Sequence, residues 1–395
     1  MIQIALVGVS GYGGCLLTAI RAVEEQGRCR LAAVCIVNRS QESALWEELS
    51  SKGVKCYEST AAMWSEMAGK IDLTVLPTPP QTHRHYTLEA LTAGSHVLCE
   101  KPTSTNVADA EEMATVAEKA PNSRRLFIGF QDIYLKGTRE LKREFLSGAH
   151  GNIRSISFLG LWPRQEQGYY GRNSWAGKLT LRGELINDNP VSNAFAHFLN
   201  LGLFFQGAEE ESSARPVDIK AELFRANAIE TFDTAALRIR TDRGIPFHFL
   251  CSHAIEENNL PTLRITTDTK VLDWKYEEGL HLQSEGNRFL CRLPKREEAR
   301  IEMLEMIVAS LHGEPANICT PTNALIPLSV SENLRSIAVK PFNPSLIRRH
   351  ELPGDSLLTV EGLAETLQEC FEKGCLPSEL SELPIPKGAS LSLPG

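Results

Sequence analysis

The sequence lacks several features that would assign it to a special class of protein. It has no C-x-x-C pair and no run of about 18 apolar residues, so it shows neither a common signature of a zinc or dithiol site nor a transmembrane helix. An excess of positive charge is also absent, because 49 acidic residues outnumber 41 basic ones and the formal net charge is -8. This balance argues against nucleic acid or an anionic membrane as the main partner. We therefore expect the partner to be a small polar molecule.

Disulfides and metal sites are not expected either. The chain has ten cysteines, but four of them lie inside apolar strand or helix patterns, which is typical of buried, reduced thiols: Cys15, Cys35, Cys99 and Cys251. No cysteine has the neighbouring ligands that a zinc site needs, so we expect no metal. The first eight residues form a strand-like apolar run without a basic region or a cleavage site of small residues, which favours a cytoplasmic protein.

A length of 395 residues favours two domains. In the first third of the chain, short apolar runs alternate with helical patterns, a rhythm that is typical of parallel strands joined by crossover helices. Strands are expected at residues 3–7, 31–37, 54–57, 73–76, 96–99 and 126–129. We therefore predict a Rossmann domain with a doubly wound parallel sheet at residues 1–129.

After residue 129 the pattern changes to longer alternating runs, which indicate antiparallel strands with one covered face. Such runs occur at residues 153–161, 219–226, 235–241, 245–252 and 263–267. We predict a second α/β domain at residues 130–340 with a large, open, mainly antiparallel sheet, followed by an extension at 341–395 with one helix near 359–371. An exposed sheet face favours a homodimer or homotetramer that assembles through this sheet.

A glycine-rich segment, Gly8-Val-Ser-Gly-Tyr-Gly-Gly14, follows the first strand and opens the first helix. Glycines allow the backbone to approach a pyrophosphate, and a helix N-terminus offers N–H groups and a favourable dipole. The motif alone is weak, since a purely structural turn could have the same sequence. We expect five residues of the segment to bind a dinucleotide: Gly8, Ser10, Gly11, Tyr12 and Gly13.

The end of the second predicted strand bears on the choice between NAD and NADP. A ribose-binding Asp or Glu would favour NAD, yet residues 35–40 contain no carboxylate. Arg39 could pair with a 2′-phosphate while Asn38 and Ser40 donate hydrogen bonds to it. Arg39 could equally be a solvated loop residue, so both cofactors stay open.

The most specific motifs lie at the ends of the fourth and fifth strands. They are T-P-x-x-x-H at residues 78–83, A-G-x-H-V at 93–97 and E-K-P at 100–102. In order and spacing they resemble the Gfo/Idh/MocA family of nicotinamide-dependent oxidoreductases. The resemblance implies a cis Lys101-Pro102 bond and several cofactor contacts: Pro77, Thr78, Pro79, His83, Glu100 and Lys101.

The position of these motifs supports a ligand site independently, because ligands of open α/β sheets bind outside the carboxyl ends of the strands. A lysine that is desolvated beside a nicotinamide can exchange a proton with a substrate hydroxyl or carbonyl. Lys101 is therefore the predicted catalytic residue, although a surface lysine that pairs with Glu100 is the ordinary alternative.

The resemblance continues beyond the first domain. It implies that Gln131, in Gly-Phe-Gln, approaches the nicotinamide, and that residues 187–197 correspond to the family helix with D-x-G-x-H. His197 then takes the place of the family histidine, while Asn193 stands where the family usually has Asp. Positions four apart share a helix face, so we expect Asn193 and His197 to point together toward Lys101 in one cleft. An amide carries no proton, which leaves acid–base chemistry to Lys101 and His197 and hydrogen bonding to Asn193.

Aromatic and basic residues gather at 162–178, in a predicted loop before that segment. Aromatic faces and multidentate donors hold sugars and their acidic derivatives, and the substrate contacts that we select are Tyr170, Arg172, Trp175 and Asn193. A packed lid loop with a solvated basic edge is the alternative.

These observations favour a hydride transfer between NAD or NADP and a carbinol or carbonyl carbon of a sugar, inositol or related polyol. Two other functions stay open. One is an NAD-dependent glycoside hydrolase of the same family that uses transient oxidation, and the other is a sensor that binds a dinucleotide without turnover.

Overall fold

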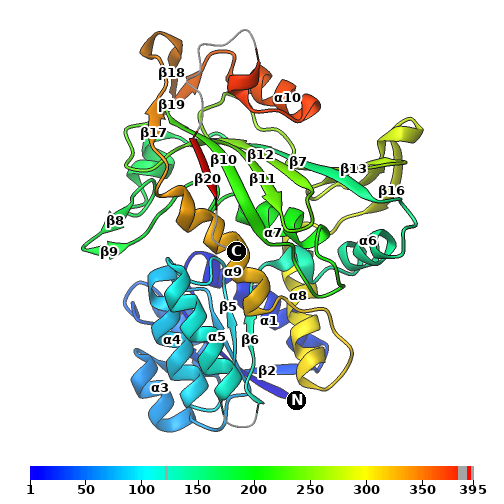
Figure 1. Ribbon diagram of the computed structural model, residues 1–395. Coiled ribbons are helices and arrows are strands. Elements are labelled where there is room, and N and C mark those ends of the chain that lie inside the picture. Colours follow the sequence, from blue (N-terminus) through cyan, green and yellow to red (C-terminus); the bar gives the residue numbers. More distant parts are fainter. Residues whose placement is uncertain (121–122, 381–388, 393–395) are drawn as a thin grey trace. The chain divides into compact units, whose positions relative to one another are not determined.

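The computed structural model describes residues 1–120, 123–380 and 389–392 (Figure 1). The chain divides into two compact units, Met1–Arg139 with Lys295–Leu325 and Glu140–Pro294 with Ile326–Gly395. Residues 295–325, which we expected in the second domain, thus return to the first unit, and the extension after residue 340 is part of the second. Among the described residues, no helix has the length and apolar character needed to span a membrane.

The first unit contains the predicted six-stranded parallel sheet, with the strand order β3-β2-β1-β4-β5-β6. Its strands are β1 (Ile2–Val7), β2 (Cys29–Cys35), β3 (Lys55–Tyr57), β4 (Leu73–Leu76), β5 (His96–Cys99) and β6 (Leu126–Ile128). The order reverses between β1 and β4, which is the point where a doubly wound sheet binds a nucleotide. The prediction of a Rossmann sheet is confirmed.

The strands are joined by α1 (Tyr12–Glu25), α2 (Ser43–Ser51), α3 (Thr60–Met67), α4 (Pro80–Thr92) and α5 (Val107–Lys119). Helices α4 and α5 lie side by side (Figure 1), and α1 packs against α8 (Arg296–Leu311), which comes from the returning segment. The side chain of Asn106 caps α5 by accepting a hydrogen bond of 2.8 Å from the backbone N–H of Asp109, as its position before the helix predicts.

The second unit is built around a ten-stranded mixed sheet whose strand order is β16-β15-β14-β13-β7-β12-β11-β10-β17, with β20 paired to β10. Among the described pairs of this second sheet, only β7–β12 and β10–β17 are parallel. The strands are β7 (Ile153–Leu161), β10 (Pro216–Arg225), β11 (Thr234–Thr241), β12 (Pro246–Ser252), β13 (Thr262–Thr267), β14 (Val271–Lys275), β15 (Gly279–Leu282), β16 (Arg288–Arg292), β17 (Val339–Pro341) and β20 (Ala389–Ser392). A large, mainly antiparallel sheet is therefore confirmed.

Smaller elements complete the chain. Two short hairpins are formed by β8 (Thr180–Leu181) with β9 (Glu184–Leu185), and by β18 (Ile347–Leu352) with β19 (Asp355–Val360). The remaining helices are α6 (Lys136–Leu146), α7 (Ala196–Phe205), α9 (Pro321–Leu334) and α10 (Leu363–Lys373). Short helical turns occur at Gln131–Ile133, Glu166–Gly171, Gln283–Glu285, Pro344–Leu346 and Pro377–Glu379.

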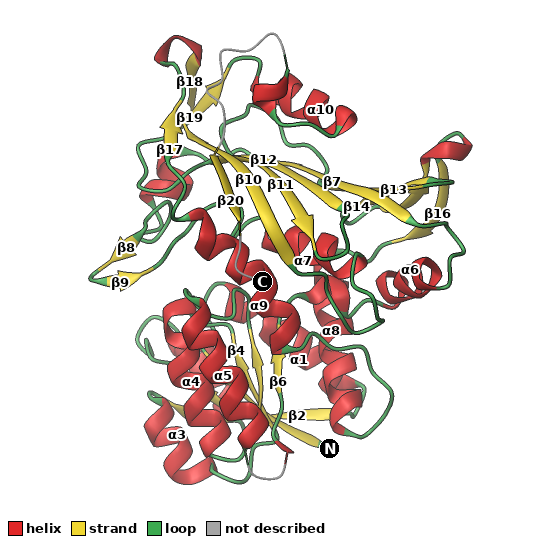
Figure 2. Cartoon of the chain, in the orientation of Figure 1, coloured by secondary structure: helices red, strands yellow, loops and turns green. Residues whose placement is uncertain are grey.

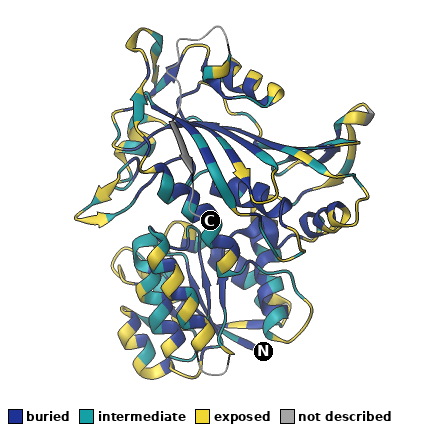
Figure 3. Ribbon diagram, viewed as in Figure 1, coloured by how far each residue is buried: buried dark blue, intermediate teal, exposed yellow. Residues whose placement is uncertain are grey.

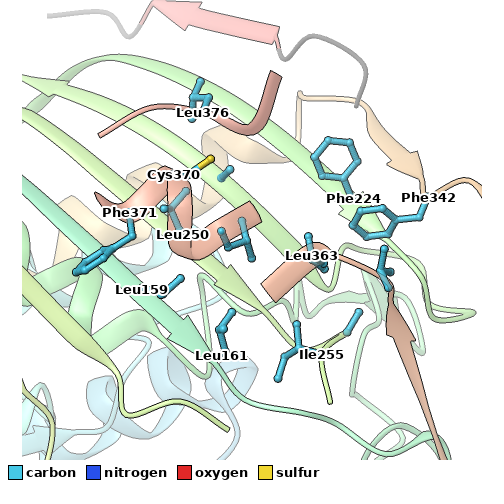
Figure 4. Packing of buried hydrophobic residues seen from close by; sticks show 14 residues of the cluster. Leu159, Leu161, Phe224, Leu250, Ile255, Phe342, Leu363, Cys370, Phe371 and Leu376 are labelled. Carbon is cyan, nitrogen blue, oxygen red and sulfur yellow. The ribbon is translucent and has the colours of Figure 1, made fainter. Parts of the chain in front are cut away.

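The large sheet carries a helix on each face (Figure 2): α7 packs on β7 and β12 from one side, and α10 packs on the same strands from the other. Burial follows this arrangement, since the strands between the two helices are mostly buried (Figure 3). Leu367 and Cys370 of α10 are fully buried in one cluster with Leu159 and Leu250 of the sheet. Figure 4 shows Cys370, Leu159 and Leu250 in this cluster. The face that we expected to be exposed is thus covered in part by the chain itself.

The helix in the extension differs from its predicted bounds. We expected it at residues 359–371, but Thr359 and Val360 belong to β19 and α10 begins at Leu363. Gly362 precedes the helix with a φ of 73°, a left-handed conformation that separates strand from helix. Gly374 ends α10 with a φ of 62°, in the C-terminal position typical of glycine.

Candidate functional site

The glycine-rich segment forms a tight turn between β1 and α1. Gly8 and Gly11 have φ values of 90° and 56°, in the region that favours glycine. A Cβ atom on Gly13 would lie 2.4 Å from the carbonyl oxygen of Gly8, so no larger residue fits there. Gly11 caps α1 without a side-chain hydrogen bond, and the first turn has no acidic residue. The positive end of the helix dipole is therefore suited to an anion such as a pyrophosphate.

The structure brings the fourth strand's end against this turn. A Cβ atom on Gly13 would contact Cγ of Pro77 at 3.5 Å, and one on Gly8 would contact Cγ2 of Thr78 at 3.6 Å. These predicted cofactor residues are far apart in the sequence but lie together at the carboxyl edge of the sheet. Pro79 is exposed and precedes α4.

The second strand's end differs from its sequence interpretation. The Arg39 guanidinium forms an ion pair of 3.0 Å with Glu58 and lies 4.5 Å from the ring centre of Trp46. Asn38 and Ser40 are exposed. A carboxylate is present after all: Ser10 in the glycine-rich turn donates a hydrogen bond of 2.5 Å to Oε1 of Glu42. Glu42 follows the segment 35–40, where a ribose-binding acid would be expected, and residue spacing does not predict its position beside the glycine turn.

His83 is fully buried in α4. Its Nε2 lies 2.7 Å from the carbonyl oxygen of Thr78, and its Nδ1 lies 3.0 Å from that of Pro102. Burial lowers the pKa of His83, although the backbone carbonyls act in the opposite direction. The imidazole thus connects the loops after β4 and β5, and its contact with the cofactor, which the resemblance implies, stays a prediction.

The E-K-P motif follows β5, and the Lys101-Pro102 bond is cis, as the resemblance implied. Glu100 is buried, and its Oε2 accepts a hydrogen bond of 3.2 Å from the backbone N–H of Lys101. Its Oε1 would lie 2.5 Å from a Cβ atom on Gly129, so the glycine after β6 makes room for this carboxylate. Lys101 itself is half-buried, and Gln131, in the turn after Gly129, is buried.

Electrostatics around Glu100 involve a residue that the sequence did not reveal. Burial raises the pKa of Glu100, while the positive charges of Lys101 and Arg300 act in the opposite direction. Arg300 comes from α8 and is buried, and its guanidinium lies 5.1 Å from the ring centre of Tyr12. Its Nε–H donates to the Tyr12 hydroxyl at 3.3 Å. A buried cation thus stands behind the glycine-rich turn.

In the second unit, the chain that leaves β7 forms an aromatic and basic cluster. The Arg164 guanidinium lies 4.8 Å from the ring centre of Tyr169, and the Tyr169 ring lies 5.1 Å from that of Tyr170 and 6.1 Å from that of Trp175. Tyr170 and Trp175 are half-buried, whereas Arg172 is exposed. The structure therefore places Arg164, which we did not select as a substrate contact, inside the cluster and places Arg172 at its surface.

Asn193 precedes α7 instead of lying on it, since the helix begins at Ala196. The prediction that Asn193 and His197 share a helix face is therefore wrong, because only His197 lies on the helix. The segment before the helix folds back, and Nδ2 of Asn193 donates a hydrogen bond of 2.8 Å to Oδ1 of Asp188. The other oxygen of Asp188 accepts from the backbone N–H of Gly177 at 2.7 Å. A buried carboxylate thus stands next to the amide that replaces the family's acid, which the spacing of five residues did not predict.

Residues 2–130 match the family model of the Gfo/Idh/MocA oxidoreductases, described as having an NAD-binding Rossmann fold. The N-terminal domain belongs to the Gfo/Idh/MocA family.

Similar proteins extend the comparison. D-glucoside 3-dehydrogenase of Escherichia coli K12 is 33% identical over 177 residues, which are 45% of this chain and 46% of that protein. The rhizopine catabolism protein MocA of Rhizobium meliloti is 28% identical over 151 residues, 38% of this chain and 45% of that protein. The matches thus span less than half of these two relatives. The WlbA dehydrogenase of Bordetella pertussis, crystallised with NADH and UDP-GlcNAcA, has a TM-score of 0.66 at 21% identity over 83% of this chain and 94% of that one.

The Gfo/Idh/MocA domain therefore holds the glycine turn, Pro77, Thr78, Glu100 and Lys101 at one sheet edge. In the second unit, the Tyr169 ring contacts those of Tyr170 and Trp175, and its hydroxyl hydrogen-bonds the Asn193 side chain, whereas Arg172 is exposed. Because Lys101 and His197 belong to different units, their meeting in one cleft stays a prediction.

Proposed function

We propose that the protein is an NAD(P)-dependent dehydrogenase or reductase that acts on a CH–OH group of a sugar, an inositol or a related polyol. Relatives with these activities by name support the substrate class. The observation that carries the proposal is the position of Lys101. It follows β5 at the carboxyl edge of the Rossmann sheet, next to buried Glu100 and in the same unit as the glycine turn.

The residues suit distinct tasks. Gly8, Gly11 and Gly13 would hold the pyrophosphate of the dinucleotide at the N-terminus of α1, and the bound nicotinamide supplies or accepts the hydride. When the alcohol is oxidised, the Lys101 amine accepts the hydroxyl proton, and in the reverse direction the ammonium returns it to the carbonyl oxygen. His197 orients the same hydroxyl.

Asn193 can hydrogen-bond a second hydroxyl through its amide. Because its Nδ2 is held by Asp188, the amide has a fixed orientation, with Oδ1 directed away from this carboxylate. Positioning of this kind supplies much of the rate enhancement when the cofactor carries the chemistry.

We further propose that NAD is the preferred cofactor. Glu42 lies against Ser10 of the glycine turn, in the place where a carboxylate can accept hydrogen bonds from the adenosine ribose. Arg39, the residue suited to a 2′-phosphate, is paired with Glu58. A carboxylate beside the turn also repels a 2′-phosphate.

We also propose a cellular compartment and an oligomeric state for the protein. All ten cysteines are free thiols, which suits a reducing compartment such as the cytoplasm. We also propose a homodimer or homotetramer that assembles through the large sheet. Since α10 covers part of one face, the contact would involve the region near β16, where Phe289 is 54% exposed.

A substrate panel tests the proposed activity. The purified protein is incubated with NAD or NADP and with glucose, glucosides, inositol and their acidic derivatives, and the formation of reduced nicotinamide is followed by absorbance. We expect Lys101→Ala to lose at least about 100-fold in kcat while it still binds the dinucleotide, because the loss of a general acid–base group costs this much. Lys119→Ala, at the exposed end of α5, is the matched control and should retain activity.

Other outcomes would contradict the assignment. Full turnover by Lys101→Ala refutes the role of this lysine. Release of a sugar from a glycoside without net reduction of NAD indicates the glycoside hydrolase instead. If the protein binds NAD but neither binds nor turns over any of the sugars, it is a dinucleotide sensor.

A further inference from the structure

Arg164 has an environment that its sequence position does not reveal. It follows β7, and its backbone N–H donates to the carbonyl oxygen of His253 at 3.2 Å. The guanidinium lies 4.8 Å from the ring centre of Tyr169 and 5.9 Å from that of Trp162, so two aromatic faces restrict it. Its Nε–H is closed to solvent and has no acceptor among the residues that the structure describes. A buried charged donor without an acceptor is costly unless a ligand or water serves it.

The groups around Arg164 do not neutralise it by an ion pair. Burial, together with the Arg164 charge, lowers the pKa of His253 to about 3, so this imidazole is uncharged near neutral pH. Its Nδ1 lies 2.7 Å from the carbonyl oxygen of Trp162. Within the described parts of the chain, no carboxylate lies within ion-pair distance of the Arg164 guanidinium.

The carboxylate of Asp188 is near the same cluster but is engaged elsewhere. Its two oxygens accept hydrogen bonds from the Asn193 amide and from the Gly177 backbone, at 2.8 and 2.7 Å. Burial and the charge of Asp188 raise the pKa of Tyr169, so its hydroxyl stays protonated and can donate a hydrogen bond. The Arg164 and Asn193 side chains both hydrogen-bond this hydroxyl, so the cluster places one restrained cation beside one phenol.

We propose that Arg164 binds an anionic oxygen group of the substrate, a carboxylate or a phosphate attached to the sugar. Tyr169 supplies a second donor. This inference rests on the proposed function, because it names the substrate class of the same enzyme. A guanidinium matches the two oxygens of such a group with parallel hydrogen bonds, and its restriction by Tyr169 and Trp162 lowers the entropy that binding would cost.

Arg154 offers a comparison on β7, the strand that precedes Arg164. It is exposed and forms an ion pair of 3.4 Å with Asp268. The competing explanation for Arg164 is structural, namely that it only holds Trp162 and Tyr169 together. A structural role would affect neutral and anionic substrates alike, whereas recognition of an anion affects only the latter.

The test compares glucose, glucuronate and glucose 6-phosphate as substrates of the full-length protein with saturating NAD. We expect the wild type to prefer one of the two anionic sugars over glucose. Arg164→Met, which keeps the apolar stem on the aromatic rings, should lower kcat/KM for that sugar about 100-fold and leave kcat/KM for glucose within about threefold. Arg164→Lys should restore part of the loss, and Arg154→Met should change neither value appreciably.

The three substrates also separate the possible results. A preference for glucuronate identifies a carboxylate, and a preference for glucose 6-phosphate identifies a phosphate. Turnover of glucose alone, or an equal loss with all three sugars in Arg164→Met, overturns the inference and leaves the dehydrogenase intact. If the protein binds NAD but turns over no sugar of a broad panel, the proposed function itself is refuted.

Discussion

Replacement of Glu42 tests how the dinucleotide is chosen. The carboxylate is held by Ser10 at 2.5 Å, at the turn where the pyrophosphate binds, so it is suited to accept hydrogen bonds from the ribose hydroxyls. Hydrogen bonds to a charged group contribute about 1.5–3 kcal/mol, which corresponds to a factor of about 10–150 in kcat/KM. We expect Glu42→Ala to lose this factor with NAD.

The same variant should use NADP better than the wild type does. Two unit charges 4 Å apart repel by about 4 kcal/mol at an effective dielectric constant near 20, and salt reduces this energy at a partly exposed site. Even a third of this repulsion corresponds to about tenfold. The preference for NAD over NADP should therefore fall by at least about 100-fold.

The assay is kcat/KM for both cofactors with one sugar at fixed ionic strength, together with the Kd of each cofactor from a binding titration. Glu47→Ala is the control, because Glu47 is exposed on the same helix, α2. If the wild type prefers NADP and Glu42→Ala changes neither value, the reasoning is refuted. Loss of NADP use in Arg39→Ala would then assign the 2′-phosphate to Arg39.

Two further predictions concern stability. Because burial raises the pKa of Glu100 above its unfolded value, the folded protein binds the extra proton, and the stability linked to it is present at low pH and lost as the pH rises through the folded pKa. Burial raises this pKa to about 7. As the pH rises from about 5 to about 8, the Tm of Glu100→Gln should therefore increase relative to that of the wild type. A Tm difference in calorimetry that does not change with pH would contradict the raised pKa, and exposed Glu118→Gln is the control. Leu367→Ala, at a fully buried site of α10, should lower the free energy of unfolding by about 2–5 kcal/mol in urea titrations, whereas exposed Gln368→Ala should change it little. A loss below about 1 kcal/mol for Leu367→Ala would show that α10 does not pack firmly on the sheet.

Local patterns predicted the parts of the fold that depend on local chemistry. The apolar runs gave the six parallel strands, Asn106 marked the start of α5, and Gly374 marked the end of α10. The glycine spacing and the E-K-P motif likewise located the edge of the sheet that carries Lys101. Each of these signals is a relation between residues that are close in the sequence.

The parts that sequence reasoning missed depend on distant contacts. Arg300 reaches Tyr12 only because residues 295–325 return to the first unit, and no periodic pattern encodes such a return. Glu42 reaches Ser10 through the course of the loop after β2, and Asp188 reaches Asn193 because the chain folds back before α7. In each case the partner is chosen by tertiary structure, which residue spacing alone does not determine.

The packing of α10 affects how the chain folds during its synthesis. Leu159 and Leu250 are synthesised well before the side chains that shield them from water, such as Leu367 and Phe371. During synthesis this apolar surface stays open until α10 has emerged from the ribosome. A chain cut after residue 340 would keep that surface exposed permanently, and aggregation would be its expected fate.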